Sequence, residues 1–210
     1  MSQLEFTNTW FEDTARPVWD QLIPQFQPRK ILEIGSYEGA SAYYLVQKLA
    51  PLHPLELHCI DTWEGGIEHQ EGGGAETDMS AVEARFLKNA RTMAESAPNP
   101  VELVVHKGFS HAQLAKILAS GHESSFDMVY VDGSHQAPDV LCDAILSFRL
   151  LKTGGLLIFD DYLWFEDLPS GKDLTRSPKI ALDAFTNIYC RKLNILALPP
   201  HQLYMQKTSD

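Results

Sequence analysis

The sequence predicts an α/β protein with a doubly wound, mostly parallel seven-stranded sheet and a reversed C-terminal strand. Between residues 30 and 161, short apolar runs alternate with segments of helical periodicity, which is typical of parallel sheets. Near the C-terminus, two extended runs flank Pro199-Pro200 with no room for a crossover helix, so the last strand must return antiparallel.

The individual elements follow from composition and from the residues that end them. The five expected parallel strands cover 30–34, 55–61, 101–107, 126–132 and 154–161, and the helices between them cover 39–50, 79–96, 110–120 and 137–152. Pro51 stops the first of these helices and Gly121 closes the third, because proline cannot continue a helix and glycine adopts the left-handed C-terminal conformation.

A length of 210 residues suits a single domain covering 1–210. Residues 1–28 form an expected helical segment whose aromatic side chains either cover the sheet edge or serve as a substrate wall or dimer contact. The glycine-rich, acidic stretch 64–78 has no periodicity, and such long loops are often lids, so we expect a mobile loop there.

The overall charge and composition exclude several classes of partner. The formal net charge is −11, which disfavours binding to nucleic acid. Three scattered cysteines without a C-x-x-C pair argue against a zinc cage or a disulfide framework. No secretory leader and no apolar run of about 18–20 residues are present. We therefore expect a cytoplasmic protein without a membrane span, and homo-oligomer formation stays open.

The turn in Ile31–Ser41 indicates the kind of ligand. A dinucleotide fingerprint would place glycines at 33, 35 and 38, whereas this chain has Glu33, Gly35 and Glu38, with its second glycine at Gly39. Carboxylates there would repel a pyrophosphate and favour a ligand that carries a cation. Asp61 ends the second strand, where an acidic residue can accept hydrogen bonds from ribose hydroxyls. S-adenosylmethionine, which has a ribose, a sulfonium and an ammonium, fits this combination.

The motifs LEIGSYEGAS, IDTWEGG, KGFS, FDMVYVDGSH and GGLLIFDDY occur in this order from about residue 30 to the C-terminus. Together they resemble the class I S-adenosylmethionine-dependent methyltransferases, and most closely the metal-dependent small-molecule O-methyltransferases. The resemblance implies the Rossmann-like methyltransferase fold, in which the seventh strand is reversed.

The resemblance also implies a set of cofactor contacts, since residues after the Asp61-type carboxylate and after the third strand flank the adenosine in that family. The candidate cofactor residues are Glu33, Gly35, Ser36, Gly39, Ser41, Asp61, Thr62, Trp63, Phe109, Ser110 and Asp132. Structural roles remain open for some of them. Glu33 can cap a neighbouring amide, Trp63 can be a core residue, and Ser110 can cap the helix that follows it.

Three carboxylates fall at the ends of the fourth and fifth strands, namely Asp132, Asp160 and Asp161. These strands are neighbours in a doubly wound sheet, and a hard divalent cation such as Mg²⁺ would relieve the repulsion between the carboxylates. The resemblance implies the same metal ligands. The alternative is that they are ordinary turn residues, because aspartate is favoured in turns for its local hydrogen bonds.

His135 lies three residues after Asp132, and histidine is the usual proton acceptor near neutral pH. We therefore expect His135 and Asp132 to be catalytic, in O-methylation of a small-molecule hydroxyl of a sugar or a phenolic natural product. In the alternative interpretation His135 caps the next helix. A metal-independent methyltransferase, or a cofactor-binding module without transfer activity, is the alternative function. The sequence does not identify the acceptor.

Overall fold

The computed structural model describes residues 4–166, 168–169 and 171–210. The chain divides into two compact units, residues 1–109 and 110–210, and each is described by itself. The first three residues of the expected N-terminal segment lie outside the described range, as do residues 167 and 170. Among the described residues, no helix has both the length and the apolar character that crossing a membrane requires.

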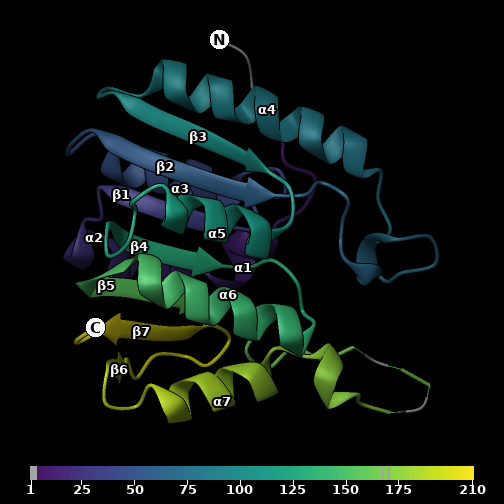
Figure 1. Ribbon diagram of the computed structural model, residues 1–210. Helices are drawn as coiled ribbons and strands as arrows, with labels where there is room; N and C mark the ends of the chain where they lie inside the picture. Colours follow the sequence, from purple (N-terminus) through teal and green to yellow (C-terminus); the bar gives the residue numbers. More distant parts are fainter. Residues whose placement is uncertain (1–3, 167, 170) are drawn as a thin grey trace. The chain divides into compact units, whose positions relative to one another are not determined.

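The first unit contains three parallel strands and the segments that connect them (Figure 1). The strands are β1 (Lys30–Ile34), β2 (Leu55–Asp61) and β3 (Val101–Lys107), in the order β3-β2-β1. The helices are α1 (Trp10–Thr14), α2 (Arg16–Phe26), α3 (Ala40–Leu49) and α4 (Met79–Ser96), with a short 3-10 turn η1 (Ile67–His69). All three strands have the predicted bounds, because each run of apolar residues ends at a clear turn signal.

Aromatic packing fixes the N-terminal helices to α3 within this unit. The Trp19 and Tyr44 rings lie 5.8 Å apart in an edge-to-face arrangement, and Phe11 contacts both. Trp19 is fully buried and Tyr44 is 2% exposed. Such pairs contribute roughly 0.5–1.5 kcal/mol beyond their buried area. The expected helical segment therefore has a packed inner face.

The second unit contains the strands β4 (Phe126–Val131), β5 (Leu151–Phe159), β6 (Leu193–Ile195) and β7 (Leu203–Lys207), in the order β4-β5-β7-β6. Its helices are α5 (Ser110–Ala119), α6 (Ala137–Leu150) and α7 (Lys179–Ile188), with a 3-10 turn η2 (Leu174–Arg176). Strand β4 is parallel to β5, whereas β7 is antiparallel to both β5 and β6.

The predicted fold class, a mostly parallel seven-stranded sheet with a reversed C-terminal strand, is confirmed. Helix α7 is an element that the sequence analysis did not predict. Ala181, Leu182 and Phe185 of this helix are buried, and its apolar residues recur at helical spacing, so local periodicity could have indicated it. Strand β5 also begins three residues earlier than expected, at Leu151. The single domain and the mobility of residues 64–78 stay predictions.

Candidate functional site

The turn between β1 and α3 depends on two glycines with left-handed backbone conformations. Gly35 has φ 83° and donates its backbone N–H to the carbonyl of Ile60 at 2.8 Å. Gly39 has φ 84°, and a Cβ atom there would lie 3.2 Å from the Phe86 ring. Glycine alone adopts this conformation without a steric penalty. The turn can therefore bring its backbone close to a ligand.

Asp61, at the end of β2, holds this turn in place. Its Oδ2 accepts hydrogen bonds from the backbone N–H groups of Ser36 and Tyr37, both at 2.9 Å, and its Oδ1 accepts one from Trp63 at 2.7 Å. Burial raises the pKa of Asp61, and these three amides oppose that shift. The carboxylate thus links the two predicted cofactor loops, and its expected bond to ribose stays a prediction.

Glu33 faces the interior of the turn. It is 0% exposed, and its carboxylate accepts hydrogen bonds from the hydroxyls of Ser36 at 2.6 Å and Ser41 at 2.5 Å. Burial raises its pKa, because the charged form loses its hydration. In this structure Glu33 ties the strand, the turn and the helix together, which is the role of a structural carboxylate. Direct contact with the cofactor stays a prediction.

Glu38 is also directed inward, although the sequence suggested that it would face the ligand. It is 2% exposed, and it accepts hydrogen bonds from the backbone N–H and hydroxyl of Thr7 and from the guanidinium of Arg85. Asn89 donates to the backbone carbonyls of Glu5 and Glu38. Glu38 is therefore used to anchor the N-terminal segment, and its charge is paired with Arg85.

The remaining predicted cofactor residues have different environments. Trp63 is 5% exposed, contacts Phe86, and donates its indole N–H to the carbonyl of Tyr37 at 3.0 Å. Thr62 accepts a hydrogen bond from the backbone of Glu64 at 3.1 Å. Phe109, in contrast, is 59% exposed at the end of the loop that follows β3. Of these side chains, the Phe109 ring is therefore the most accessible to a ligand.

Ser110 is the first residue of α5, in the second unit, and its side chain hydrogen-bonds with Asp143 of α6. Asp143 is 1% exposed, and burial raises its pKa to about 7. The hydroxyl is therefore engaged between two packed helices, and contact of Ser110 with adenine stays a prediction.

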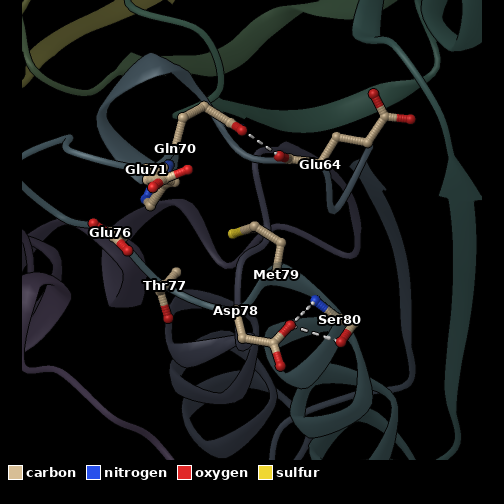
Figure 2. Close-up of a pocket in the computed structure, with 9 residues that line it drawn as sticks. Glu64, Gln70, Glu71, Glu76, Thr77, Asp78, Met79 and Ser80 are labelled. Carbon is tan, nitrogen blue, oxygen red and sulfur yellow. Dashed lines mark hydrogen bonds between the residues drawn. The ribbon is translucent and has the colours of Figure 1, made fainter.

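The segment 64–78 borders an open pocket of about 620 Å³ in the first unit, and Figure 2 shows its lining side chains. Gln70 donates to the backbone carbonyl of Glu64 at 2.9 Å, and Asp78 caps α4 by accepting from the backbone of Ser80 at 3.0 Å. The His69 ring lies 5.6 Å from that of Tyr37, which belongs to the turn after β1. The segment thus has internal hydrogen bonds and contacts the glycine turn.

In the second unit, three predicted site residues come together beyond the ends of β4 and β5. Potential ligand atoms of Asp132, His135 and Asp161 all lie within 4.8 Å of one another. The His135 Nε2 lies 2.9 Å from the Asp161 Oδ2, and the His135 ring lies 4.1 Å from the Trp164 ring. Two carboxylates and an imidazole are a reasonable donor set for a divalent cation.

Asp160, the third predicted metal ligand, is not part of this group and has another set of partners. Its Oδ2 contacts the Tyr130 hydroxyl and accepts a hydrogen bond from the Gln202 amide at 2.7 Å. Its Oδ1 accepts from the backbone N–H of Asp161 at 2.8 Å. Burial, and then the charge of Asp161, raises the pKa of Asp160.

The Tyr130 hydroxyl lies between two carboxylates, since it also contacts the Asp132 Oδ2 at 2.9 Å. Tyr204 in turn donates to the Gln202 Oε1 at 2.6 Å, and all three network residues, Tyr130, Gln202 and Tyr204, are at most 2% exposed. This network was not predicted from the sequence. Tyr130 has the pattern of a core strand residue, and Gln202 follows it by 72 positions, so no local signal marks the pair.

The comparisons with known proteins identify the class. A family model described as "Methyltransferase domain" matches residues 32–162, more than half of the chain, and the chain belongs to this family. The matched region includes the turn after β1, Asp61, and the cluster after β4 and β5. The resemblance to class I S-adenosylmethionine-dependent methyltransferases is thereby confirmed.

Two curated relatives match most of this chain. "Probable caffeoyl-CoA O-methyltransferase 3" of Dictyostelium discoideum is 22% identical in an alignment of 171 residues that covers 77% of this chain and 58% of the relative. "Uncharacterized protein y4gI" of Sinorhizobium fredii is 26% identical in an alignment of 157 residues that covers 73% of this chain and 15% of the relative. The chain therefore spans little more than half of the first relative and a small part of the second.

Solved structures agree on the fold. An O-methyltransferase from Bacillus cereus in complex with SAH has a TM-score of 0.60 at 15% identity, covering 99% of this chain and 84% of that one. CalS11, a TDP-rhamnose 3'-O-methyltransferase of calicheamicin biosynthesis, has a TM-score of 0.61 at 17% identity, covering 90% and 77%. At these identities the likeness establishes the fold and leaves the substrate open.

Proposed function

We propose that this protein is an S-adenosylmethionine-dependent O-methyltransferase that acts on a hydroxyl of a small molecule and is assisted by a divalent metal. The observation that carries the proposal is the glycine turn clamped by Asp61, which lies inside the region matched by the methyltransferase family. The O-methyltransferase from B. cereus was solved with SAH. TomG, an O-methyltransferase from Streptomyces achromogenes with a TM-score of 0.58 at 18% identity, was solved with SAM, and both structures support the same cofactor here.

S-adenosylmethionine supplies an electrophilic methyl group when it is bound. The residues of the first unit would bind and orient it. Gly35 and Gly39 allow the backbone to approach the cofactor closely. Asp61 holds the turn after β1 and the loop after β2 together, and the exposed Phe109 ring offers an apolar surface. Binding of the cofactor would add interactions to a turn that is already fixed by hydrogen bonds, so little ordering would be needed.

The residues of the second unit fit a divalent cation, because Asp132, His135 and Asp161 bring carboxylate and imidazole ligands together. A cation held there supplies Lewis-acid chemistry that lowers the pKa of an acceptor hydroxyl. His135 has two possible roles in this arrangement. It either takes the hydroxyl proton while Asp161 orients the ring, or it is itself a ligand.

The acceptor would contact the segment after β5, where loops carry specificity on this kind of scaffold. Trp164 lies against His135, and Phe165 is 41% exposed. Aromatic surfaces of this kind suit a sugar ring or a phenol, and we propose these two acceptor classes. The cytoplasmic location and the absence of membrane and nucleic-acid partners are retained as parts of the proposal, and homo-oligomer formation stays open.

The test is a transfer assay that follows S-adenosylhomocysteine release with sugar and phenol acceptors, after chelator treatment and after addition of Mg²⁺ or Mn²⁺. We expect release with at least one acceptor class, a loss of at least tenfold with chelator, and recovery with metal. Asp161→Asn should reduce the rate by a similar factor, whereas Asp127→Asn, which alters a surface ion pair with Lys152, should not.

The alternatives predict different outcomes in the same assay. A metal-independent methyltransferase would keep its rate in chelator and in Asp161→Asn. A cofactor-binding module would bind S-adenosylmethionine and release no product with any acceptor. Either outcome would contradict the metal-assisted reaction.

A further inference from the structure

The adjacent residues Asp160 and Asp161 have different hydrogen-bond partners. From this difference we infer different roles for them in the metal site, and the inference rests on the proposed function. We propose that Asp161 binds the metal together with Asp132 and His135, whereas Asp160 does not touch the metal and instead positions its neighbours. The imidazole ligand would make the site prefer Mn²⁺ or Co²⁺ to Mg²⁺, because nitrogen ligands suit transition metals better than magnesium.

The spacing of His135 and Asp161 is that of two ligands on one cation. Two donor atoms that each lie about 2.1 Å from a metal at a right angle are roughly 3 Å apart. The His135 Nε2 and the Asp161 Oδ2 are separated by 2.9 Å, so both atoms are close enough to bind one cation, which would lie beside the line that joins them and would replace their hydrogen bond. The contact of Trp164 with the His135 ring holds the imidazole in this orientation.

Asp160 is engaged elsewhere on both of its oxygens. Oδ2 contacts Tyr130 and accepts from Gln202, and Oδ1 accepts from the backbone N–H of Asp161. The partners Tyr130 and Gln202 are 1% and 2% exposed. Turning this carboxylate toward a metal would break three hydrogen bonds, two of them to the buried side chains of Tyr130 and Gln202, which is costly.

The same bonds place the two neighbouring aspartates. Asp161 has φ 55°, a left-handed conformation that is uncommon for residues other than glycine, and the bond from its N–H to Asp160 helps to keep it. The Tyr130 hydroxyl contacts both Asp160 and Asp132. A shift of Asp160 would therefore also move Asp132, which is a second proposed ligand. Asp160 therefore acts through its neighbours and is a positioning residue.

The reversed strand completes this arrangement. Phe159 of β5 pairs with Leu203 of β7, so the next position along each strand brings Asp160 beside Gln202. Tyr204 donates to the Gln202 carbonyl oxygen and fixes which end of the amide faces Asp160. The C-terminal hairpin thus contributes to the metal site without supplying a ligand.

The test is Mn²⁺ binding to the full chain without cofactor or acceptor, measured by calorimetry and by electron-nuclear spectroscopy of the bound ion. The wild-type protein should bind one Mn²⁺ at least tenfold more tightly than Mg²⁺, with a ¹⁴N coupling from His135. His135→Asn should remove this coupling and the metal preference, and Asp161→Asn should weaken binding at least tenfold. Unchanged Mn²⁺ binding by His135→Asn would exclude it as a ligand.

Tyr130→Phe separates a positioning role of Asp160 from a ligand role. If Asp160 positions its neighbours, Tyr130→Phe and Asp160→Asn should each weaken Mn²⁺ binding about tenfold while keeping the ¹⁴N coupling. The double variant should lose no more than either single variant, because both act in one network. Binding that is unchanged or tighter in Tyr130→Phe, or a double variant with additive losses, would overturn the positioning role.

Tyr44→Phe, which removes a buried hydroxyl bonded to Asp20 in the first unit, is the matched control and should bind Mn²⁺ like the wild-type protein. Thermal melting of each variant identifies any that fails to fold. Binding of S-adenosylmethionine to the wild-type protein is measured separately. If S-adenosylmethionine does not bind, the proposed function is contradicted. The roles of Asp160 and His135 are decided by the metal titration alone.

Discussion

Acidic residues have two kinds of role in this protein, and their hydrogen-bond partners distinguish them. Glu33, Glu38 and Asp61 are bonded to serine hydroxyls, to Arg85 or to backbone amides, and they shape the turn after β1. Asp132 and Asp161 instead have carboxylate oxygens within 4.8 Å of a ring nitrogen of His135. The first kind of carboxylate builds the loops, and the second kind is suited to chemistry.

At the level of a single residue, Asp61→Asn tests whether the hydrogen bonds between Asp61 and the turn after β1 contribute to cofactor binding. The substitution replaces one carboxylate oxygen by an NH₂ group, which would face a backbone N–H donor and lose at least one hydrogen bond. We expect the affinity for S-adenosylmethionine to fall about tenfold or more, since a lost buried bond to a charged group costs about 1.5–3 kcal/mol. Titration calorimetry measures this change.

Asp173→Asn is the control for that variant, because Asp173 also accepts a backbone N–H, from Thr175, but at the exposed turn η2 in the second unit. Its affinity for S-adenosylmethionine should match that of the wild-type protein. If Asp61→Asn and the wild-type protein have equal affinities for S-adenosylmethionine, the hydrogen bonds of Asp61 do not contribute to cofactor binding.

At the level of elements, the contribution of the contact between α5 and α6 to the stability of the protein should depend on pH. Burial raises the pKa of Asp143 to about 7, whereas an unfolded aspartate titrates near about 3.9. Between these pH values the folded state binds more protons than the unfolded state, so stability falls as pH rises. Asp143→Asn should flatten this dependence and stabilise the protein at pH 8 by about 1–4 kcal/mol.

Urea denaturation at pH 4.5, 6 and 8 measures the effect. The difference in unfolding free energy between Asp143→Asn and the wild-type protein should grow with pH over this range. A difference that stays constant, or that shrinks as pH rises, would mean that Asp143 is ionised in the folded protein.

The junction of α6 and β5 depends on a buried lysine. Lys207 of β7 is 1% exposed, and its ammonium donates to the carbonyls of Phe148 at 3.0 Å and Leu151 at 2.8 Å. Lys207→Met should lower the unfolding free energy by about 1–3 kcal/mol, because the carbonyls lose their partner. Lys152→Met removes a surface pair with Asp127 and should cost less than about 1 kcal/mol. Equal losses in the two variants would contradict this role.

For the molecule as a whole, the sequence predicted the helices and strands better than it predicted which side chains hydrogen-bond to one another. The bounds of β1, β2 and β3 follow from local alternation and turn residues, and the antiparallel β7 follows from the short connection at Pro199. Helix α7 was missed although its apolar residues recur at helical spacing.

The candidate site was predicted in part. Its cluster of Asp132, His135 and Asp161 could be found because consecutive parallel strands end at the same edge of a sheet. The inward orientation of Asp160 could not, because it depends on Gln202, 42 residues later. Glu38 was misread as facing the ligand for the same reason, since Arg85 follows it by 47 residues.

Calorimetric titration of S-adenosylmethionine into the purified protein, with Mg²⁺ and then with chelator, tests directly whether the turn after β1 binds this cofactor. We expect binding of one cofactor per chain with a Kd in the micromolar range, which corresponds to a binding free energy of about −8 kcal/mol. The cofactor should bind with or without metal, because the proposed cation contacts the acceptor. No binding under either condition would contradict the proposed methyltransferase function, and the turn held by Glu33 and Asp61 would then be a structural feature only.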